Sequence, residues 1–459
     1  MSRVLVVGGG IAGLAAAWEA SRRGAEVTVA EASESFGGKV ATERTDGFTI
    51  EHGPDSFVAY RPAGLALIDE LGMREDLIEV TGARTVHLRS RGRLHPLPAG
   101  MGMVLPTRLG PFVTTGILSW TDKLRAGLDL VLPRRLGAED VAIGAFLRAR
   151  LGDGVVRRFA DPMVGGIYGA GVDQLSLDAV LPSLRENERT HRSLMLASLA
   201  QGRAARSRPG SGRGPSSPFR SLSGGMGSLP ARLTDALARA GVTLRTRTEV
   251  QGLDWDGHTS SARLTGGTLD GLDAVILAGG ARASAELLDA HAPVAAEALR
   301  SIPMASSTVV SLGYPTSAFP SPVTTHGWLE ADPAPISGVT VSSAKWAGRA
   351  PEGQVLLRAF VPSRLGAIAS APDSALLDAV TRHVSDVLAI TGSPSLVRIS
   401  RWPGMMPTYT VGHLDRVAAV DAALAVRPTW QVAGSALRGV GVPDCIADGR
   451  RAVTAAGIG

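Results

Sequence analysis

Cysteine is almost absent from this chain. Cys445 is the only cysteine among 459 residues, so no disulfide can form within one copy, and a C-x-x-C redox pair is excluded. A single cysteine is most often a small buried hydrophobe. We therefore predict that Cys445, in the segment RGVGVPDCIADGRR, packs beside the chemistry of the protein and does not perform it. The scarcity of cysteine also fits a reducing cytoplasm.

Aromatic residues, dense basic runs and long apolar runs are scarce as well. Aromatics make up 4% of the chain, which argues against a platform for stacking nucleic-acid bases. The longest apolar stretch, at residues 100–118, is broken by Pro106, Arg108 and Pro111, and a spanning helix needs about 18 uninterrupted residues. We predict no nucleic-acid partner, no transmembrane segment and, because three glycines interrupt the apolar start of the chain, no export signal.

Length and charge set further bounds. A chain of this length exceeds one ordinary core, so two or three domains are expected. The net charge of +5 has two interpretations. Either it follows simply from an arginine-rich composition, or it indicates a basic cleft for an acidic substrate. The same charge permits peripheral contact with anionic lipid surfaces. No metal-ligand cluster and no Ser/His/Asp arrangement is evident, so we predict no metal site and name no catalytic base.

The start of the chain carries a glycine-rich turn between a strand and a helix. Residues 4–7 form a short apolar run typical of a buried parallel strand. Gly8, Gly10 and Gly13 follow with G-x-G-x-x-G spacing, and a helical pattern continues to residue 23. In such a unit the glycines permit the turn, the approach of a pyrophosphate and close helix packing, respectively. The helix N-terminus offers N–H groups to the phosphates.

An acidic residue at the end of the next strand limits which dinucleotides the site can accept. Glu31 lies eighteen positions after Gly13, where a carboxylate accepts hydrogen bonds from ribose hydroxyls and disfavours a 2′-phosphate. The segments SGGMGS and LAGGARA do not complete a second G-x-G-x-x-G unit. We therefore predict that the chain binds one dinucleotide. We also predict that no second, nicotinamide-containing nucleotide binds elsewhere on the chain to supply electrons to the first.

A paired-glycine turn then favours FAD. Residues 37–39 read Gly-Gly-Lys just past Glu31, and HGPDSF at 52–57 supplies a turn rich in donors. Here the chain resembles the flavoprotein superfamily of amine oxidases, phytoene desaturases and protoporphyrinogen oxidases. That resemblance implies FAD as the cofactor.

The remaining pattern predicts an α/β fold with a Rossmann-like FAD-binding domain, a mixed-sheet substrate domain and a helical domain. Residues 201–220 form a Gly/Ser/Arg/Pro loop that suits a solvated excursion better than a substrate lid. A helix is expected from 229 to 239, a strand ending near Val250, and a final strand, glycine loop and helix after residue 430. The six pieces are expected to be FAD-binding at 1–60, 206–285 and 403–459, substrate-binding at 61–95 and 286–402, and helical at 96–205.

Motifs along the whole chain resemble one branch of the superfamily. HGPDSF, GRLHPLPAGMGMVLPT, DPMVGGIYGAGVDQLSL, SLSGGMGSLP and RGVGVPDCIADG occur in the order found in bacterial protoporphyrinogen and coproporphyrinogen oxidases. Their details are most similar to the Gram-positive-type coproporphyrinogen III oxidases. One departure is Leu437, near which family members often carry an aromatic residue.

The resemblance implies a set of FAD contacts and a set of substrate contacts. The FAD contacts carried over are Gly8, Gly9, Gly10, Ile11, Ala12, Gly13, Glu31, Ala32, Lys39, Gly53, Pro54, Asp55, Ser56, Val250, Trp402, Gly434, Val440, Gly441 and Val442. Because the implied substrate carries four propionates, basic side chains are its candidate partners, and Tyr409 is placed near it. The substrate candidates are Arg61, Arg84, Arg89, Tyr409 and Arg438.

The implied reaction is the oxidation of coproporphyrinogen III to coproporphyrin III in haem biosynthesis. Dioxygen would reoxidise the flavin and form hydrogen peroxide, and a ferrochelatase is a candidate for transient contact. Two alternatives stay open. One is protoporphyrinogen IX oxidase, whose substrate has fewer carboxylates. The other is a flavoprotein amine oxidase, which Leu437 and Arg438 fit poorly because they do not form an aromatic cage.

Overall fold

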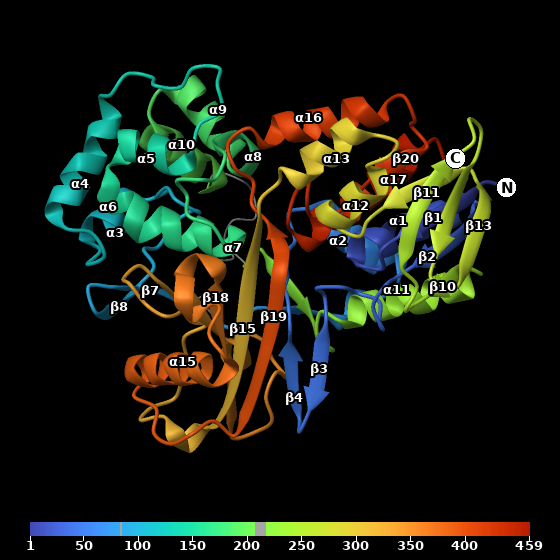
Figure 1. Cartoon of the computed structure of the whole chain (residues 1–459). Coiled ribbons are helices and arrows are strands. Elements are labelled where there is room, and N and C mark those ends of the chain that lie inside the picture. The colour runs from blue at the N-terminus through green and yellow to red at the C-terminus, as the bar shows by residue number, and fades with distance from the viewer. Residues whose placement is uncertain (83–84, 207–216) are drawn as a thin grey trace. The chain divides into compact units, whose positions relative to one another are not determined.

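Two groups of chain segments form separate compact units in the computed structural model, which describes residues 1–82, 85–206 and 217–459 (Figure 1). Unit 1 contains Met1–Glu79, Pro218–Ile302 and Asp415–Gly459, and unit 2 contains the intervening segments Val80–Ser217 and Pro303–Leu414. The predicted division into three domains and six pieces stays a prediction.

A five-stranded parallel sheet is the centre of unit 1. The strands at residues 3–7 and 274–277 are short runs of mostly buried apolar residues, as expected for a sheet that helices cover on both faces, whereas the edge strand at 243–245 is exposed or partly exposed. The order is β10-β2-β1-β14-β20, and every neighbouring pair is parallel. The strands are β1 (Arg3–Val7), β2 (Glu26–Ala30), β10 (Thr243–Arg245), β14 (Ala274–Leu277) and β20 (Trp430–Val432).

Small residues let the helices of unit 1 approach one another closely. Six buried alanines and glycines line α1 (Ile11–Arg22). An added Cβ on Gly449 of α17 (Val442–Ala455) would lie 2.2 Å from the carbonyl oxygen of Ala12. The other helices are α2 (Pro62–Glu70), η1 (Arg74–Asp76), α11 (Ser228–Arg239), α12 (Ala281–Leu288), α13 (Pro293–Arg300) and α16 (His413–Leu424), the last beginning at the end of unit 2.

Three small antiparallel sheets complete unit 1. One expectation about them is wrong: the strand predicted to end near Val250 ends at Arg245, and a new strand begins at Val250. The chain turns between the two at Arg247, whose φ is +48°. The sheets are β3 (Thr42–Thr45) with β4 (Phe48–Glu51), β11 (Val250–Trp255) with β12 (Ser260–Leu264) and β13 (Gly267–Leu272), and β9 (Phe219–Leu222) between β5 (Phe57–Val58) and β6 (Leu77–Glu79).

A seven-stranded mixed sheet forms one part of unit 2. Its order is β19-β15-β18-β17-β16-β7-β8, with one parallel pair, β16 and β7. The long strands β15 and β19 run antiparallel side by side (Figure 1). The strands are β7 (Val86–Ser90), β8 (Arg93–Pro96), β15 (Met304–Pro315), β16 (Gly327–Glu330), β17 (Gly338–Val341), β18 (Gln354–Pro362) and β19 (Leu396–Pro407), with η4 (Thr316–Ala318), α14 (Ser342–Lys345), η5 (Ser363–Ile368) and α15 (Asp373–Leu388) among them.

Helices form the other part of unit 2, and their apolar side chains share one core. A π-helical stretch, η3 (Val156–Gly165), contains Pro162, whose missing N–H cannot continue an α-helical ladder. The helices are α3 (Leu109–Thr114), α4 (Trp120–Gly127), η2 (Leu128–Leu130), α5 (Ile143–Leu151), α6 (Asp153–Val155), η3, α7 (Gly166–Tyr168), α8 (Leu177–Val180), α9 (Pro182–His191) and α10 (Leu194–Arg206).

The parallel sheet, the mixed sheet and the helical cluster confirm the predicted fold class. Half of the predicted 201–220 loop, residues 207–216, lies outside the described residues, as does Arg84. The loop prediction is wrong at both ends, because residues 201–206 continue α10 and residues 219–220 begin β9. None of the helices in the described ranges combines the length and apolar character that crossing a bilayer requires.

Candidate functional site

The turn between β1 and α1 needs glycine at two positions. Gly8 has a φ of +99°, and an added Cβ would lie 2.7 Å from the backbone nitrogen of Gly279. A Cβ on Gly13 would lie 1.9 Å from the carbonyl oxygen of Gly8. The absence of side chains therefore lets α1 begin directly against the strand that precedes it, as the G-x-G-x-x-G spacing predicts.

Gly10 leaves the start of α1 open. It is the N-cap residue, its backbone is extended, and no side chain caps the helix. A Cβ built on Gly10 would meet no atom of the described residues within 4 Å, so the backbone is open on that side. Ile11 and Ala12, the next residues, are buried. Open N–H groups at a helix start, with room for close approach, fit the pyrophosphate of a dinucleotide.

Glu31 lies against this turn. Its Oε2 accepts a hydrogen bond of 2.6 Å from the backbone N–H of Gly9, and its Oε1 accepts one of 2.8 Å from Ser33. The side chain is partly exposed, and the neighbouring Ala32 is exposed. A carboxylate has about four acceptor sites, so Glu31 keeps acceptor capacity for ribose hydroxyls.

Lys39 and the turn at residues 53–56 pack on each other. The Lys39 ammonium donates a 3.2 Å hydrogen bond to Ser435 Oγ. Burial lowers the pKa of Lys39, and the nearby Cys445 acts in the opposite direction. A Cβ on Gly53 would lie 1.9 Å from the Lys39 carbonyl oxygen, so the backbones touch there. Pro54 follows, and then Asp55, whose Oδ1 accepts a 2.7 Å bond from Ser56 Oγ.

The segment from Gly434 into α17 forms the C-terminal part of the site. Gly434 has a φ of +117°, and its N–H donates a 2.9 Å hydrogen bond to the buried carboxylate of Asp448. Val440 precedes Gly441, the extended and side-chain-free N-cap of α17, and Val442 begins the helix. The carboxylate of Asp444, in the first turn of α17, lies against this helix start and accepts a hydrogen bond from the Gly441 N–H.

Cys445 lies in the first turn of α17 and is buried in the core of unit 1. Burial raises the pKa of its thiol from 9.0 to about 12, with Lys39 opposing the shift. A neutral, buried thiol is a poor nucleophile. The prediction that Cys445 is a packed side chain is confirmed.

Two of the predicted substrate residues are ion-paired within unit 1. Arg61 Nε lies 3.5 Å from Asp444 Oδ1, and Arg438 bonds Asp421 and, at 3.4 Å, Asp448. Burial raises the pKa of Asp444, and Arg61 opposes that rise. Sequence reasoning missed these carboxylates. For Asp444 and Asp448, a signal was available: they lie four residues apart, directly after a glycine loop.

Unit 2 holds the other described candidates. Arg89 Nη1 lies 3.5 Å from Glu330 Oε2. Tyr409 is buried and stacks on His413, with ring centroids 3.9 Å apart, and it also contacts Tyr168. Trp402 of β19 lines a pocket of about 450 Å³, together with hydroxyl side chains and Arg401.

The predicted FAD contacts thus divide between the units. All of them except Trp402 belong to unit 1, where Val250 opens β11 as a buried residue. Among the described residues no group of His, Cys, Asp and Glu side chains could hold a metal ion.

Known proteins resemble the chain along nearly its whole length. A coproporphyrinogen III oxidase of Propionibacterium freudenreichii subsp. freudenreichii is 58% identical, covering 97% of this chain and 89% of that protein. One of Bacillus subtilis strain 168 is 34% identical over 98% and 97% of the two chains. The crystal structure of a putative protoporphyrinogen oxidase from Exiguobacterium sp. 255-15 matches with a TM-score of 0.86 at 33% identity, covering 99% and 98%.

A family model described as flavin containing amine oxidoreductase matches residues 11–456. This range begins just after Gly10 and includes Gly13, Glu31, Lys39 and the whole C-terminal segment. Solved putrescine oxidases share the fold at a TM-score of 0.69 and 18% identity. The resemblance stated from the motifs is thereby confirmed, FAD is the cofactor, and the chain belongs to the flavin-containing amine oxidoreductases.

Proposed function

We propose that this protein is an FAD-dependent oxidase that converts coproporphyrinogen III to coproporphyrin III in haem biosynthesis. The observation that carries the proposal is the 58% identity, over 97% of the chain, with a coproporphyrinogen III oxidase. The open glycine turn at Gly10 and the carboxylate of Glu31 support it, because they fit the dinucleotide such an enzyme needs.

The proposed FAD contacts come from several separated places on the chain. Gly8–Gly13 would hold the pyrophosphate, and Glu31 and Ala32 the ribose. Lys39 with the turn at 53–56, and Gly434 with residues 440–442, would contact the flavin half. Val250 and Trp402 complete the set as the resemblance implies.

When bound, FAD supplies a two-electron acceptor that dioxygen can reoxidise. Over three cycles the macrocycle would lose six hydrogens, four from the meso carbons and two from nitrogen, as three hydrides and three protons. The three hydrides and one of the protons would leave meso carbons, and two protons would leave nitrogen, while three molecules of dioxygen would be reduced to three of hydrogen peroxide. Aromatisation provides driving force, so the chain's own residues mainly position the substrate and exclude water. We assign no catalytic base.

The partners and location follow from this proposal. Propionates of the substrate would be met by Arg61, Arg84, Arg89 and Arg438, with Tyr409 nearby. Each described arginine of this set already forms an ion pair with a carboxylate, so a propionate would compete with that carboxylate or share the arginine. The cytoplasm is the proposed location, and transient contact with a ferrochelatase stays a prediction.

The experiment that tests the function compares two substrates. FAD-loaded protein is mixed in air with coproporphyrinogen III and, separately, with protoporphyrinogen IX, and porphyrin fluorescence and peroxide are followed. Faster oxidation of coproporphyrinogen III, with matching peroxide, is expected. A preference for protoporphyrinogen IX would replace the proposed substrate. No reaction with either, from protein with a normal flavin spectrum, would contradict the proposal and direct assays to amines.

A further inference from the structure

A polar pocket lies in unit 2 beside α15 and the loop that follows this helix. Its volume is about 410 Å³, and polar groups dominate its lining. The residues that line it include Tyr314, Asp378, Arg382, Ser385 and Ser393. All of them belong to one segment of unit 2, and none is among the predicted FAD or substrate contacts. We call this cavity the α15 pocket.

The two faces of α15 differ in character. Leu376, Val380 and Val384, spaced four residues apart, are fully buried, and they share a core with apolar residues of the seven-stranded sheet beside the helix (Figure 1). Asp378 and Arg382, also four residues apart, are exposed, and residues at this spacing lie on one helix face. The packing of the apolar face fixes the rotation of α15 and therefore places the two charged residues beside the pocket.

The loop after α15 is held at both ends. The N–H of Thr391 donates a 2.9 Å hydrogen bond to the carbonyl oxygen of Ala318, and the N–H of Ser395 donates one of 2.8 Å to the carbonyl oxygen of Gly313. Ser393 lies between these two anchors. This wall of the α15 pocket is therefore part of the folded unit, so a ligand would meet a preformed site.

Tyr314 supplies a buried hydroxyl at this pocket. The residue is fully buried, and its ring packs edge-on against Phe319 with ring centroids 6.0 Å apart. Among the described residues, no partner forms a hydrogen bond of ordinary geometry with the hydroxyl. Burial raises the pKa of Tyr314, and Ser385 acts in the opposite direction, so the hydroxyl end of the ring lies toward Ser385 and the pocket. A buried polar group without a partner is costly, and a ligand atom bonded to it would remove that cost.

The charges at the α15 pocket are of both signs. Within the described residues neither the Asp378 carboxylate nor the Arg382 guanidinium forms an ion pair. Unpaired charges on an exposed helix are ordinary, but these two line the same cavity as the unpartnered hydroxyl. Arg382 and the hydroxyls offer donors, whereas an ionised Asp378 only accepts. A ligand that satisfies both must carry an anionic acceptor and a cationic donor.

We propose that the α15 pocket binds a small zwitterion of the α-amino-acid class. Arg382, with the hydroxyls of Tyr314 and Ser385, would hold the carboxylate, and Asp378 would hold the ammonium. A simple anion would be repelled by Asp378 and a simple amine by Arg382, whereas a zwitterion pairs with both. The volume of the pocket leaves room for an amino-acid side chain. This binding does not rest on the proposed oxidase activity, and no turnover is assigned to the pocket.

Isothermal titration calorimetry of the FAD-loaded protein tests this binding, with each of the common L-amino acids as the probe. At least one is expected to bind without changing the flavin absorbance, because no residue of the pocket is a proposed FAD contact. Arg382→Gln and Asp378→Asn should each weaken binding of that amino acid about tenfold or more, since each removes a charge-assisted contact. Tyr314→Phe, which keeps the ring, should weaken it about fivefold, the effect of one neutral hydrogen bond.

A matched pair of charges in unit 1 provides the control. Asp235 and Arg239 of α11 are four residues apart and exposed, and neither forms an ion pair within the part of the chain that the structure describes. Asp235→Asn and Arg239→Gln therefore make the same changes of charge on residues outside the α15 pocket, and both should bind like the unchanged protein. Near-UV circular dichroism and flavin content establish that each variant is folded.

Derivatives of the bound amino acid test the need for both charges. The N-acetyl derivative lacks the ammonium and the amide derivative lacks the carboxylate. Each should bind about tenfold more weakly or worse, because each loses one charge-assisted contact.

Three results would overturn the proposal. The first is that no amino acid binds. The second is binding that the pocket variants and the control variants reduce equally, or that changes the flavin absorbance, which would place the amino acid beside the flavin. The third is stronger binding by Asp378→Asn than by the unchanged protein, which would make the pocket a site for simple anions.

Discussion

At the scale of the single residue, substitutions at Gly10 and Gly13 distinguish a role in cofactor binding from a role in folding. The Cβ of an alanine at position 10 would meet no atom of the described residues within 4 Å, whereas that of an alanine at position 13 would meet the carbonyl oxygen of Gly8. We predict that Gly10→Ala leaves the free energy of unfolding of the apoprotein within about 0.5 kcal/mol and weakens FAD binding about tenfold or more, or ~1.4 kcal/mol. Gly13→Ala should weaken FAD binding and also lower the free energy of unfolding, by about 1–3 kcal/mol.

Denaturant unfolding of the apoproteins and FAD titration measure the two quantities. Equal FAD affinity in Gly10→Ala and the unchanged protein would show that no phosphate approaches this backbone. In that case the glycine turn serves helix packing alone.

Cys445 carries a second residue-scale prediction. Its thiol pKa is raised by burial from 9.0 to about 12, so the folded protein keeps the thiol proton over a range in which the unfolded chain loses it. The thiol's contribution to the free energy of unfolding is therefore intact below pH 9. It falls by at most about 1.4 kcal/mol per pH unit as the pH rises from about 9 toward 12.

Cys445→Ala removes the pH-dependent contribution of the thiol to the free energy of unfolding, because alanine does not titrate. The difference in stability between Cys445→Ala and the unchanged protein should therefore shift in favour of the variant as the pH rises through this range. Urea unfolding at a series of pH values measures it. A difference independent of pH would mean that the thiol ionises normally in the folded state.

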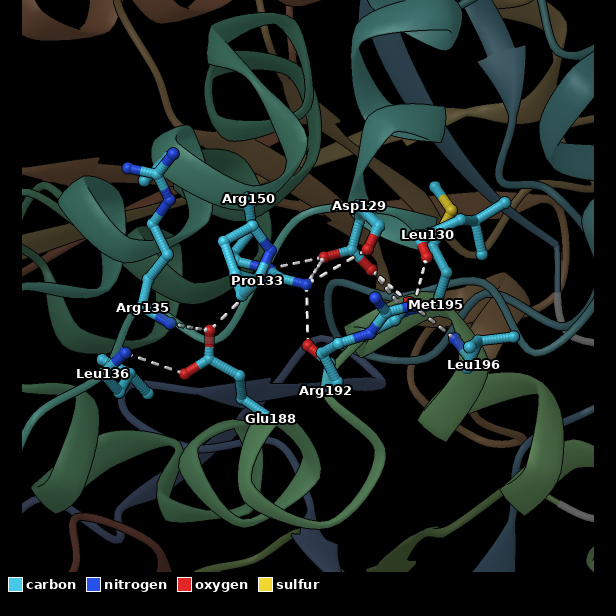
Figure 2. A network of polar contacts seen from close by, with 12 residues as sticks. Asp129, Leu130, Pro133, Arg135, Leu136, Arg150, Glu188, Arg192, Met195 and Leu196 are labelled. Carbon is cyan, nitrogen blue, oxygen red and sulfur yellow. Dashed lines mark hydrogen bonds and ion pairs between the residues drawn. The ribbon is translucent and has the colours of Figure 1, made fainter.

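At the scale of elements, one buried arginine holds several helices of unit 2 together. Arg150 of α5 is fully buried, bonds Asp129 of η2 at 2.6 Å and lies 3.3 Å from Glu188 of α9 (Figure 2). Its guanidinium also donates to the carbonyl oxygens of Pro133 and Arg192. Removing one partner from such a network leaves uncompensated buried charge.

We predict that Arg150→Met lowers the free energy of unfolding by about 3–5 kcal/mol, because two carboxylates would remain buried without their cation. Arg189→Met is the matched control, since Arg189 pairs with Glu186 on the exposed side of α9 and exposed pairs add little. Thermal unfolding followed by circular dichroism compares the two. A similar, small loss in both would show that water reaches the Arg150 network.

These elements also show what the sequence allows one to predict. The strand, glycine turn and helix at the start of the chain follow from residues within thirty positions of one another, so β1, α1, β2 and the place of Glu31 were predictable. The partners of Arg150 lie 21 and 38 positions away, and no local pattern connects them. The break of the strand before Val250 depends on the turn at Arg247, where an arginine gives no signal of positive φ.

At the scale of the whole molecule, segments that are neighbours in space come from distant parts of the sequence. Unit 1 is made of three segments, so its parallel sheet joins strands from the first thirty residues, from 243–277 and from 430–432. The proposed FAD contacts in unit 1 come from all three of its segments. A ligand that bridges segments distant in sequence binds the folded chain and not the unfolded one, so it must stabilise the fold.

We therefore predict that FAD raises the unfolding temperature of the apoprotein by several degrees, since a ligand at a hundred times its Kd adds about 2.7 kcal/mol. NADP⁺ at the same concentration should produce no shift, because the Glu31 carboxylate, held at 2.6 Å on the Gly9 N–H, repels a 2′-phosphate. Differential scanning calorimetry of the apoprotein with each nucleotide measures this. An NADP⁺ shift equal to that of FAD would mean that Glu31 does not face the ribose, and the nucleotide would then have to lie differently on the glycine turn.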